Sequence, residues 1–334
     1  MLCYYLYMSI YLSHMSALYY LRSFGANFAE LTRYQRAQFA PAVAPDVQTV
    51  EQLVKAVGLP LPLEVTVCEA SARIPSEQLR YHVRSAILPR DCFSRISSGI
   101  VVSSPEHCFL QMATRLSLVE LIELGYEFCG RYSLPGLNES LETMQRGFYD
   151  RPPLTNVKRL LSLVQQMKGT RGQVKAMKAL KYIVDNSASP VETKLAILLT
   201  LPYKLGGRAL PLPVMNASMN VSIDGHSKSA TRLFCDLFWP NAKVAVEYDS
   251  DMYHTGATRI ASDSRRRALL LSAGVSVITV TNTQLRNANE FETIAKLLAT
   301  NLGVRLRSNE NPGFPTAHRQ LRMMLFSNNY ARAY

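Results

Sequence analysis

Hydrophobic spacing in the first half of the chain switches between helical and strand-like patterns. The segments, in chain order, are 47–57 with helical spacing, 63–68 and 99–103 with strand-like runs, and 118–129 with helical spacing. A further helix is predicted after Ser104, because serine followed by proline and an acid is a typical helix start. This mixture predicts a mixed α/β domain over residues 1–132.

Residues 133–186 are predicted to form a helical linker. Polar stretches containing proline and glycine precede two helical segments, 156–168 and 172–184. The second segment carries a row of basic residues at helical spacing: Arg171, Lys175, Lys178 and Lys181. Such a row is either a solvated helix face or a surface that follows a phosphate backbone, and the sequence leaves both interpretations open.

Residues 187–303 show a different order of elements, and residues 304–334 form a polar tail. Ser189 and Glu192 make a capping-box sequence that starts a helix. Strand-like runs, a helix and a final strand follow at residues 219–223, 232–239, 243–249, 259–273 and 275–281. The pattern predicts an α/β domain with the order αβββαβ, in which a helical crossover leads to the last strand.

Three carboxylates are predicted to gather on the central hairpin of this domain. If Asn241-Ala242 is the two-residue loop, Asp236 lies opposite Glu247, and Asp249 projects from the same face. Like charges this close raise one another's pKa values and destabilise the fold unless a cation lies between them. All-oxygen ligands favour Mg²⁺ or Mn²⁺. The alternative is an edge hairpin whose acids point into water.

The net charge of the chain and its distribution indicate which kind of partner it binds. The 334 residues include 37 Lys+Arg and 25 Asp+Glu, a formal net charge of +12, and 48% are hydrophobic, which excludes a disordered, collagen-like or coiled-coil chain. Residues 1–150 hold 12 basic and 14 acidic side chains, whereas residues 151–334 hold 25 and 11, a net of +14. The second half is therefore where a polyanion such as DNA would bind.

The first 21 residues carry no charged side chain, but they are rich in tyrosine and serine and lack a basic start and a cleavage site. We therefore predict a buried strand over 4–13 and a helix over 15–22, in a cytoplasmic protein with no membrane partner.

Three histidines of the first half have no acidic partner at helical spacing and are expected to be structural: His14, His82 and His107.

The order of motifs in the second half resembles a known nuclease family. The pattern D-x-x-W-P, E-Y-D, H, D-x-x-R and G-x-x-V-x-x-V-T runs from Asp236 to Thr281. It is similar to the very-short-patch-repair-like branch of the PD-(D/E)XK superfamily, over about residues 187–302. The first half weakly resembles bacterial proteins that join such a domain to an abortive-infection (AbiEi-like) N-terminal region. The resemblance implies a restriction-endonuclease-like core and magnesium-dependent hydrolysis of DNA, in defence or repair.

The same resemblance implies roles for individual residues. Asp236 and Glu247 would bind the metal, with Asp249 where the superfamily often has a lysine. Glu192 would support the metal through water, or serve only as a helix cap. The remaining roles are His254 as general base or water-orienting group, Arg266 with Asp263 as a phosphate or supporting group, Arg265 and Arg267 as DNA contacts, and Gln284 as a polar support.

Two departures from the family pattern affect the expected activity. Ser250 stands where close relatives favour glycine after E-Y-D, and the lysine is missing. A non-catalytic DNA-binding regulator or antitoxin that keeps the nuclease scaffold is therefore the alternative, with a protein partner for the N-terminal domain. RNA and single-stranded or mismatched DNA also stay open as substrates.

Overall fold

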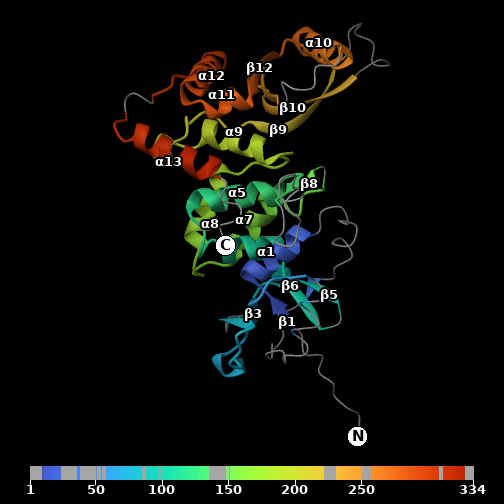
Figure 1. The fold of residues 1–334 in the computed structure, drawn as a ribbon, viewed down its shortest axis with the longest axis vertical. Coiled ribbons are helices and arrows are strands. Elements are labelled where there is room, and N and C mark those ends of the chain that lie inside the picture. The colour runs from blue at the N-terminus through green and yellow to red at the C-terminus, as the bar shows by residue number, and fades with distance from the viewer. Residues whose placement is uncertain are drawn as a thin grey trace. The chain divides into compact units, whose positions relative to one another are not determined.

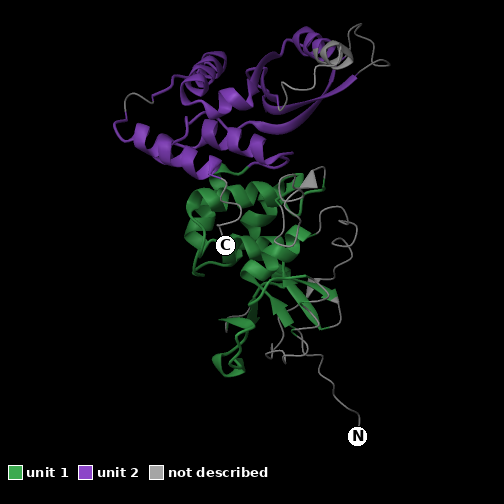
Figure 2. Ribbon diagram, in the orientation of Figure 1, with its two compact units in different colours: residues 1–183, 334 green, residues 184–333 purple. Residues whose placement is uncertain are grey.

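The chain folds into two compact α/β units, residues 1–183 with 334, and residues 184–333 (Figure 2). The structure is a computed structural model that describes residues 10–23, 36–37, 50, 54, 58–84, 88–97, 99–134, 148–149, 151–221, 231–249, 257–307 and 311–327. The mixed α/β fold class predicted from the sequence is confirmed (Figure 1).

Unit 1 is built on a mixed sheet with the strand order β2-β5-β6-β1-β3-β4. The strands are β1 (Ile10–Leu12), β2 (Arg36–Ala37), β3 (Leu63–Val67), β4 (Leu79–Val83), β5 (Phe93–Ser97) and β6 (Ile100–Ser103). β1 pairs in parallel with β6, and β3 pairs in parallel with β4. A second, two-stranded sheet joins β7 (Tyr132–Ser133) to β8 (Phe148–Tyr149). The predicted strands at 63–68 and 99–103 are thus confirmed, whereas most of the predicted helix 47–57 lies outside the described residues.

Five described α-helices complete unit 1: α1 (His14–Ser23), α4 (Pro105–Met112), α5 (Leu118–Cys129), α7 (Val157–Gln166) and α8 (Gln173–Ala179). Short 3₁₀ turns are η1 (Ala70–Ala72), η2 (Arg90–Cys92) and η3 (Leu180–Tyr182). Ser104 accepts a hydrogen bond from the His107 N–H at the start of α4, as the sequence predicts. The segment expected to be a linker belongs to unit 1, because α7 packs against α4 and α8 against α5.

A buried ion pair crosses the interior of unit 1. Arg22 in α1 donates two hydrogen bonds to the carboxylate of Glu127 in α5, from Nε to Oε1 at 2.9 Å and from Nη2 to Oε2 at 2.8 Å. The side chain of Glu127 is 0% exposed and that of Arg22 is 5% exposed. Glu127 Oε1 also accepts the N–H of Leu134. These contacts connect two helices that are far apart in sequence.

Unit 2 contains the predicted αβββαβ order as α9 (Pro190–Thr200), β9 (Val214–Val221), β10 (Thr231–Trp239), β11 (Val244–Asp249), α10 (Ala257–Ser272) and β12 (Ser276–Thr281). Its sheet order is β12-β11-β10-β9. β9, β10 and β11 are antiparallel, and β11 and β12 pair in parallel, as a helical crossover between them requires. The turn η4 (Tyr203–Leu205) and the helices α11 (Asn282–Arg286), α12 (Ala288–Asn301) and α13 (Phe314–Phe326) follow the core elements or connect them.

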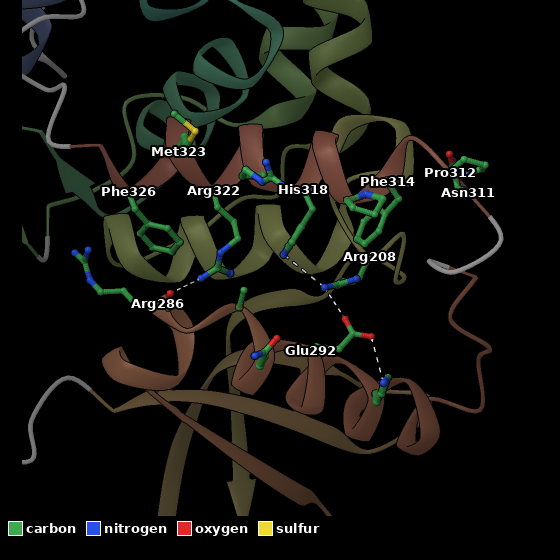
Figure 3. A pocket seen from close by; sticks show the side chains of 15 residues that line it. Arg208, Arg286, Glu292, Asn311, Pro312, Phe314, His318, Arg322, Met323 and Phe326 are labelled. Atoms are coloured by element: carbon green, nitrogen blue, oxygen red, sulfur yellow. Dashed lines mark hydrogen bonds and ion pairs between the residues drawn. The ribbon is translucent and has the colours of Figure 1, made fainter.

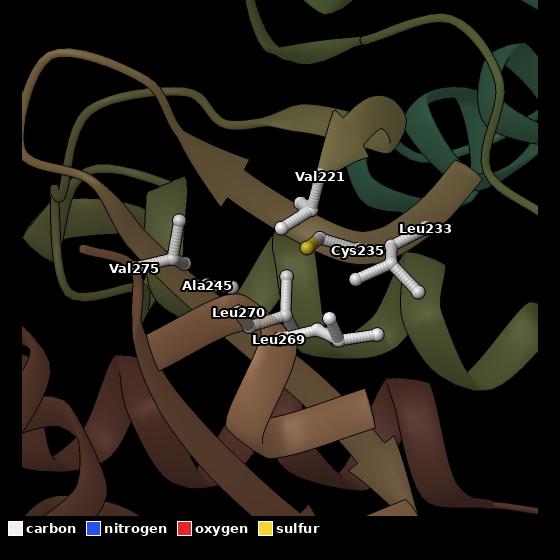
Figure 4. Close-up of a cluster of buried hydrophobic side chains, with 7 residues drawn as sticks. All are labelled: Val221, Leu233, Cys235, Ala245, Leu269, Leu270 and Val275. Atoms are coloured by element: carbon white, nitrogen blue, oxygen red, sulfur yellow. The ribbon is translucent and has the colours of Figure 1, made fainter. Parts of the chain in front are cut away.

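A hydrophobic cluster fixes α10 against the strands of unit 2 (Figure 4). Its buried members come from three strands, α10 and the turn before β12: Val221, Leu233, Cys235, Ala245, Leu269, Leu270 and Val275. Leu270 and Cys235 are fully buried. Because these contacts anchor the second half of α10, they also set where Arg266, one helical turn earlier, meets the sheet.

The predicted C-terminal tail is partly an element of unit 2, because α13 packs on η4 and α9. Gly206, which ends η4, makes this close approach possible. Its φ is +89°, and a Cβ at this position would lie 2.4 Å from the carbonyl oxygen of Ala317 in α13. A side chain would therefore be strained by the backbone and blocked by the helix.

Three further findings concern the described residues. Within the described residues no helix has both the length and the apolar character needed to cross a membrane. The predicted N-terminal strand and helix are found as β1 and α1, although residues 1–9 lie outside the description. The five cysteines that the structure describes form no disulfide.

Candidate active site

The central hairpin has the register expected from its sequence. Leu237 pairs with Val246, and the ladder continues to Trp239 opposite Val244. The turn is closed by a hydrogen bond from the N–H of Lys243 to the carbonyl oxygen of Pro240 at 3.2 Å. Asp236 and Glu247 are the next residue on each strand beyond the last ladder pair. The predicted register is therefore confirmed, and it places the two acids at the same level of the sheet.

Asp236 is largely buried and held by the neighbouring strand. Its Oδ2 accepts the backbone N–H of Tyr248 at 2.8 Å. Burial raises the pKa of Asp236, and the hydrogen bond from Tyr248 and the charge of Arg266 offset part of this rise. The carboxylate is thus kept in a place where its negative charge is poorly solvated.

Glu192 approaches Asp236 from the first turn of α9. Its carboxylate accepts the Ala188 N–H at 2.9 Å and the Ser189 hydroxyl at 2.9 Å, and its own N–H donates to Ser189 Oγ. Asn216 Nδ2 donates to Glu192 Oε2 at 2.7 Å. Burial, and next the negative charge of Asp236, outweigh these three donors and raise the pKa of Glu192 to about 7. Glu192 therefore serves as a helix cap and also faces the acid on β10.

The raised pKa of Glu192 predicts how the stability of unit 2 depends on pH. The folded state, with a pKa of about 7 against the usual 4.5, holds a proton that the unfolded chain releases between these values. Stability should therefore fall as pH rises from about 4.5 to 7 and remain lower above that range. We expect Tm in EDTA to fall over this range, and Glu192→Gln to remove part of that fall.

A comparison of Tm with and without Mg²⁺ complements this pH series. At pH 8 a bound cation takes the place of the missing proton, so Tm of the wild-type chain should rise when Mg²⁺ is added. Glu192→Gln should respond less. If Tm falls equally with pH in wild type and in Glu192→Gln, ionisation of Glu192 does not destabilise the fold.

Glu247 is paired with a cation that belongs to the protein. Arg266 Nη2 lies 2.6 Å from Glu247 Oε1 and also donates to the carbonyl oxygen of Phe234. The side chain of Glu247 is 13% exposed and that of Arg266 is 36% exposed. Arg266 thus connects α10 to two strands, and it fixes one oxygen of Glu247.

The donor set suits a hard divalent cation. Glu192, Asp236 and Glu247 offer only carboxylate oxygens. The charge of Asp236 raises the pKa of Glu192, and the charge of Arg266 offsets part of the rise at Asp236. Within the described residues, however, the group of three side chains whose ligand atoms converge within 4.8 Å lies elsewhere, at His14, Glu64 and His82. Binding of a cation would have to draw the three acids closer together.

The other predicted site residues have separate surroundings. Asp249 ends β11 and is exposed. His254 and the side chain of Asp263 lie outside the described residues. Gln284 forms a reciprocal capping box with Thr281 at the start of α11, so its amide is used by the helix.

Asn216 is a site residue that the sequence analysis missed. It lies opposite Asp236, between the ladder pairs Ala217–Cys235 and Met215–Leu237, and has a φ of +46°. Asparagine tolerates this left-handed conformation better than most residues. The kink directs its amide to Glu192 and to the carbonyl oxygen of Asn186. An asparagine inside a run of strand residues is the signal that could have indicated it.

The predicted basic row on α8 is not a continuous helical face. α8 begins at Gln173, so Arg171 precedes it, and Lys181 lies on η3. Lys175 donates to the carbonyl oxygen of Leu116 at 2.7 Å, while Lys178 is exposed. On α10, Arg265 is exposed, and Arg267 is exposed with a hydrogen bond to Thr279 Oγ1 at 3.2 Å.

A hollow in unit 2, of about 1010 Å³, lies along α13 (Figure 3). Its arginines are mostly engaged within the protein. Arg208 pairs with Glu292 at 2.5 Å and stacks over Phe314, and Arg322 donates to the carbonyl oxygens of Leu285 and Arg286. These contacts hold α13 in place, which gives part of the tail a structural role.

Comparison with known proteins gives distant relatives only. Two uncharacterized proteins of Mycobacterium tuberculosis, from strains CDC 1551 and H37Rv, are each 26% identical to this chain over 117 residues. The match covers 35% of this chain and 39% of each relative, so it spans well under half of their length. No known family profile matches the sequence, and no solved structure matches it.

Proposed function

We propose that unit 2 is a metal-dependent nuclease domain that hydrolyses phosphodiester bonds in DNA. The observation that carries this proposal is the approach of the buried Glu192 to Asp236 at the level of the sheet where Glu247 lies. Helix α9 and two adjacent strands supply these acids in the αβββαβ order expected of a restriction-endonuclease-like core. Carboxylates whose pKa values are raised by burial and by a neighbouring charge are typical of functional sites.

Asp236 and Glu247 would hold a Mg²⁺ or Mn²⁺ ion, with Glu192 supporting it. Such an ion polarises a phosphoryl oxygen and lowers the pKa of a bound water. The protein's own part is to position the ligands: Tyr248 fixes one oxygen of Asp236, and Arg266 fixes one oxygen of Glu247. Arg266 is one-third exposed, so it is also available to neutralise charge on a phosphate. His254 stays a proposal for the general base.

Exposed arginines on α10 give this site a means of binding the DNA backbone. Arg265 and Arg267 flank Arg266 in the sequence, and both are exposed. Contacts of this kind are made to phosphates and carry no sequence information. We therefore propose binding that weakens steeply with salt and differs little between DNA sequences.

The direct test is cleavage of supercoiled plasmid by the full chain. Mg²⁺ or Mn²⁺ should produce nicked and linear DNA, and EDTA or Ca²⁺ in place of these ions should give little or none. Oligonucleotides of single-stranded DNA, mismatched duplex and RNA distinguish the remaining substrate classes. Absence of cleavage of every substrate with both ions would contradict the proposal.

The alternative is a DNA-binding regulator without catalysis, and one observation favours it. Arg266 already neutralises Glu247, so this acid has a partner without any metal. A regulator would bind DNA in EDTA, would not cleave it, and would bind equally well after Asp236→Asn. A nuclease would lose cleavage in that variant.

A further inference from the structure

Three potential metal ligands meet in unit 1, far from the proposed nuclease residues in the sequence. His14 begins α1, Glu64 lies on β3 and His82 on β4, and one ligand atom of each lies within 4.8 Å of the other two. His82 Nε2 lies 2.8 Å from Glu64 Oε2. The rings of His14 and His82 stack with centroids 3.6 Å apart. The three side chains thus share one small space.

The strand pairing explains why spacing along the chain does not indicate this cluster. β3 and β4 are parallel, with Glu64 opposite Arg80 and Thr66 opposite His82. Glu64 and His82 are therefore diagonal neighbours on one face of the sheet. His82 has no acidic partner at helical spacing, but the adjacent strand supplies one, Glu64.

His14 has a left-handed backbone conformation at this point. Its φ is +46°, which few residues other than glycine adopt, although histidine does so more often than most. The N–H of His14 donates to Gln111 Oε1 at 3.0 Å, and Ser13 Oγ lies 3.1 Å from its Nδ1. A hydrogen bond to one ring nitrogen leaves the other available to a ligand, which is the usual arrangement of metal-binding histidines. Strained residues of this kind concentrate at functional sites.

Two of the three residues, His14 and His82, line a cavity of about 500 Å³. Arg84, Arg171 and Thr170 contribute to the same wall, and Arg84 Nη2 donates to Thr170 Oγ1 at 2.9 Å. A metal ion bound by three protein groups would therefore have room for water or an anionic ligand at its remaining position.

We propose that His14, Glu64 and His82 bind a divalent transition-metal ion of the Zn²⁺ class. Two imidazole nitrogens and one carboxylate oxygen select such an ion over Mg²⁺. Ligand atoms on a tetrahedral zinc lie about 3.3 Å apart, given bonds of about 2.0–2.1 Å. The 2.8 Å separation of His82 and Glu64 needs only a small opening to reach that value.

The local charges fit this assignment, and they identify Arg115 as the group that competes with a metal ion for the Glu64 carboxylate. Burial raises the pKa of Glu64, but hydrogen bonds from His82 and Arg115 outweigh this effect and hold the pKa at about 2. Arg115 Nη1 lies 2.6 Å from Glu64 Oε1, so Oε2 is the oxygen that an ion would take. The stacked rings of His14 and His82 must also rotate away from each other before a nitrogen lone pair of each can reach the same ion. His82, with 24% of its side chain exposed, has room to move.

The test is titration with Co²⁺ of the full chain, without a histidine tag and after removal of metal by a chelator. We expect one equivalent of Co²⁺ to give visible d–d absorption, and Zn²⁺ to displace it. His82→Gln should weaken binding at least tenfold. Asp236→Asn, which alters the proposed nuclease site, and Arg171→Gln, which alters the cavity wall without removing a ligand, should leave it unchanged.

A second variant keeps the test decisive if His82→Gln folds poorly. His82→Cys replaces nitrogen with a thiolate, which binds the same class of metal. It should retain one Co²⁺ and add an intense near-ultraviolet charge-transfer band. Failure of the folded wild-type chain to bind Co²⁺, or equal binding by wild type and His82→Gln, would overturn the proposal. Neither result bears on Mg²⁺-dependent cleavage by unit 2.

Discussion

Asp236→Asn is expected to reduce Mg²⁺-dependent DNA cleavage at least about a hundredfold, the usual loss when one charge-stabilising group is removed from an active site. Asparagine has nearly the same shape, and its amide oxygen can still accept the N–H of Tyr248. The change therefore removes negative charge with little change in packing. Initial rates of plasmid nicking at saturating Mg²⁺ measure the effect.

Stability and a surface control make this result interpretable. Asp236 is a poorly solvated carboxylate with a raised pKa, so removing its charge should leave Tm in EDTA unchanged or higher. Glu290→Gln, at an exposed carboxylate on α12 of the same unit, should cleave like wild type. Removing a needed charge-stabilising group lowers the rate far more than about threefold. A cleavage rate of Asp236→Asn within a factor of about three of wild type would therefore place the catalytic metal elsewhere.

Glu127→Ala is expected to give the largest loss of stability, about 3–5 kcal/mol in the free energy of unfolding of unit 1. The substitution removes the carboxylate that accepts two hydrogen bonds from the buried guanidinium of Arg22. Arg151 is also buried nearby, and the charge of Glu127 acts on it. Urea unfolding followed by far-ultraviolet circular dichroism measures the change.

Two comparisons separate this effect from general damage. Glu120→Ala, in the same helix, removes only an exposed capping interaction and should cost about 1 kcal/mol. Trp239 is the chain's one tryptophan and lies in unit 2, so its fluorescence follows that unit separately and should change little. A cost below about 1 kcal/mol for Glu127→Ala would show that water reaches Arg22 and solvates it, contrary to its burial.

Local signals explain why the hairpin of unit 2 and helix starts in both units could be predicted. The hairpin register follows from a tight turn signal, Pro240-Asn241-Ala242, between two runs of strand residues. Helix starts at Ser104 and Ser189 follow from serine caps with proline at the next position. Each of these features depends on residues a few positions apart, so the sequence pattern is sufficient.

Contacts across long stretches of chain could not be predicted in this way. Glu64 and His82 meet because two strands happen to be parallel neighbours, and Arg22 and Glu127 are 105 residues apart. Asn216 depends on a local kink in β9 that no strand pattern specifies. The pairing of Arg266 with Glu247 required both the crossover and the packing of α10 on the sheet. Tertiary structure decides all four.

The packing of α13 on α9 and η4 has a consequence for protein synthesis. Gly206 meets Ala317, a residue that the ribosome adds more than a hundred positions later. During translation, α9 therefore emerges long before its partner helix exists. Unit 2 can complete its packing only after α13 has left the exit tunnel, whereas unit 1 has all its described elements by then. The packing of α9, the helix that carries Glu192, is therefore completed only after β10 and β11 have been synthesised.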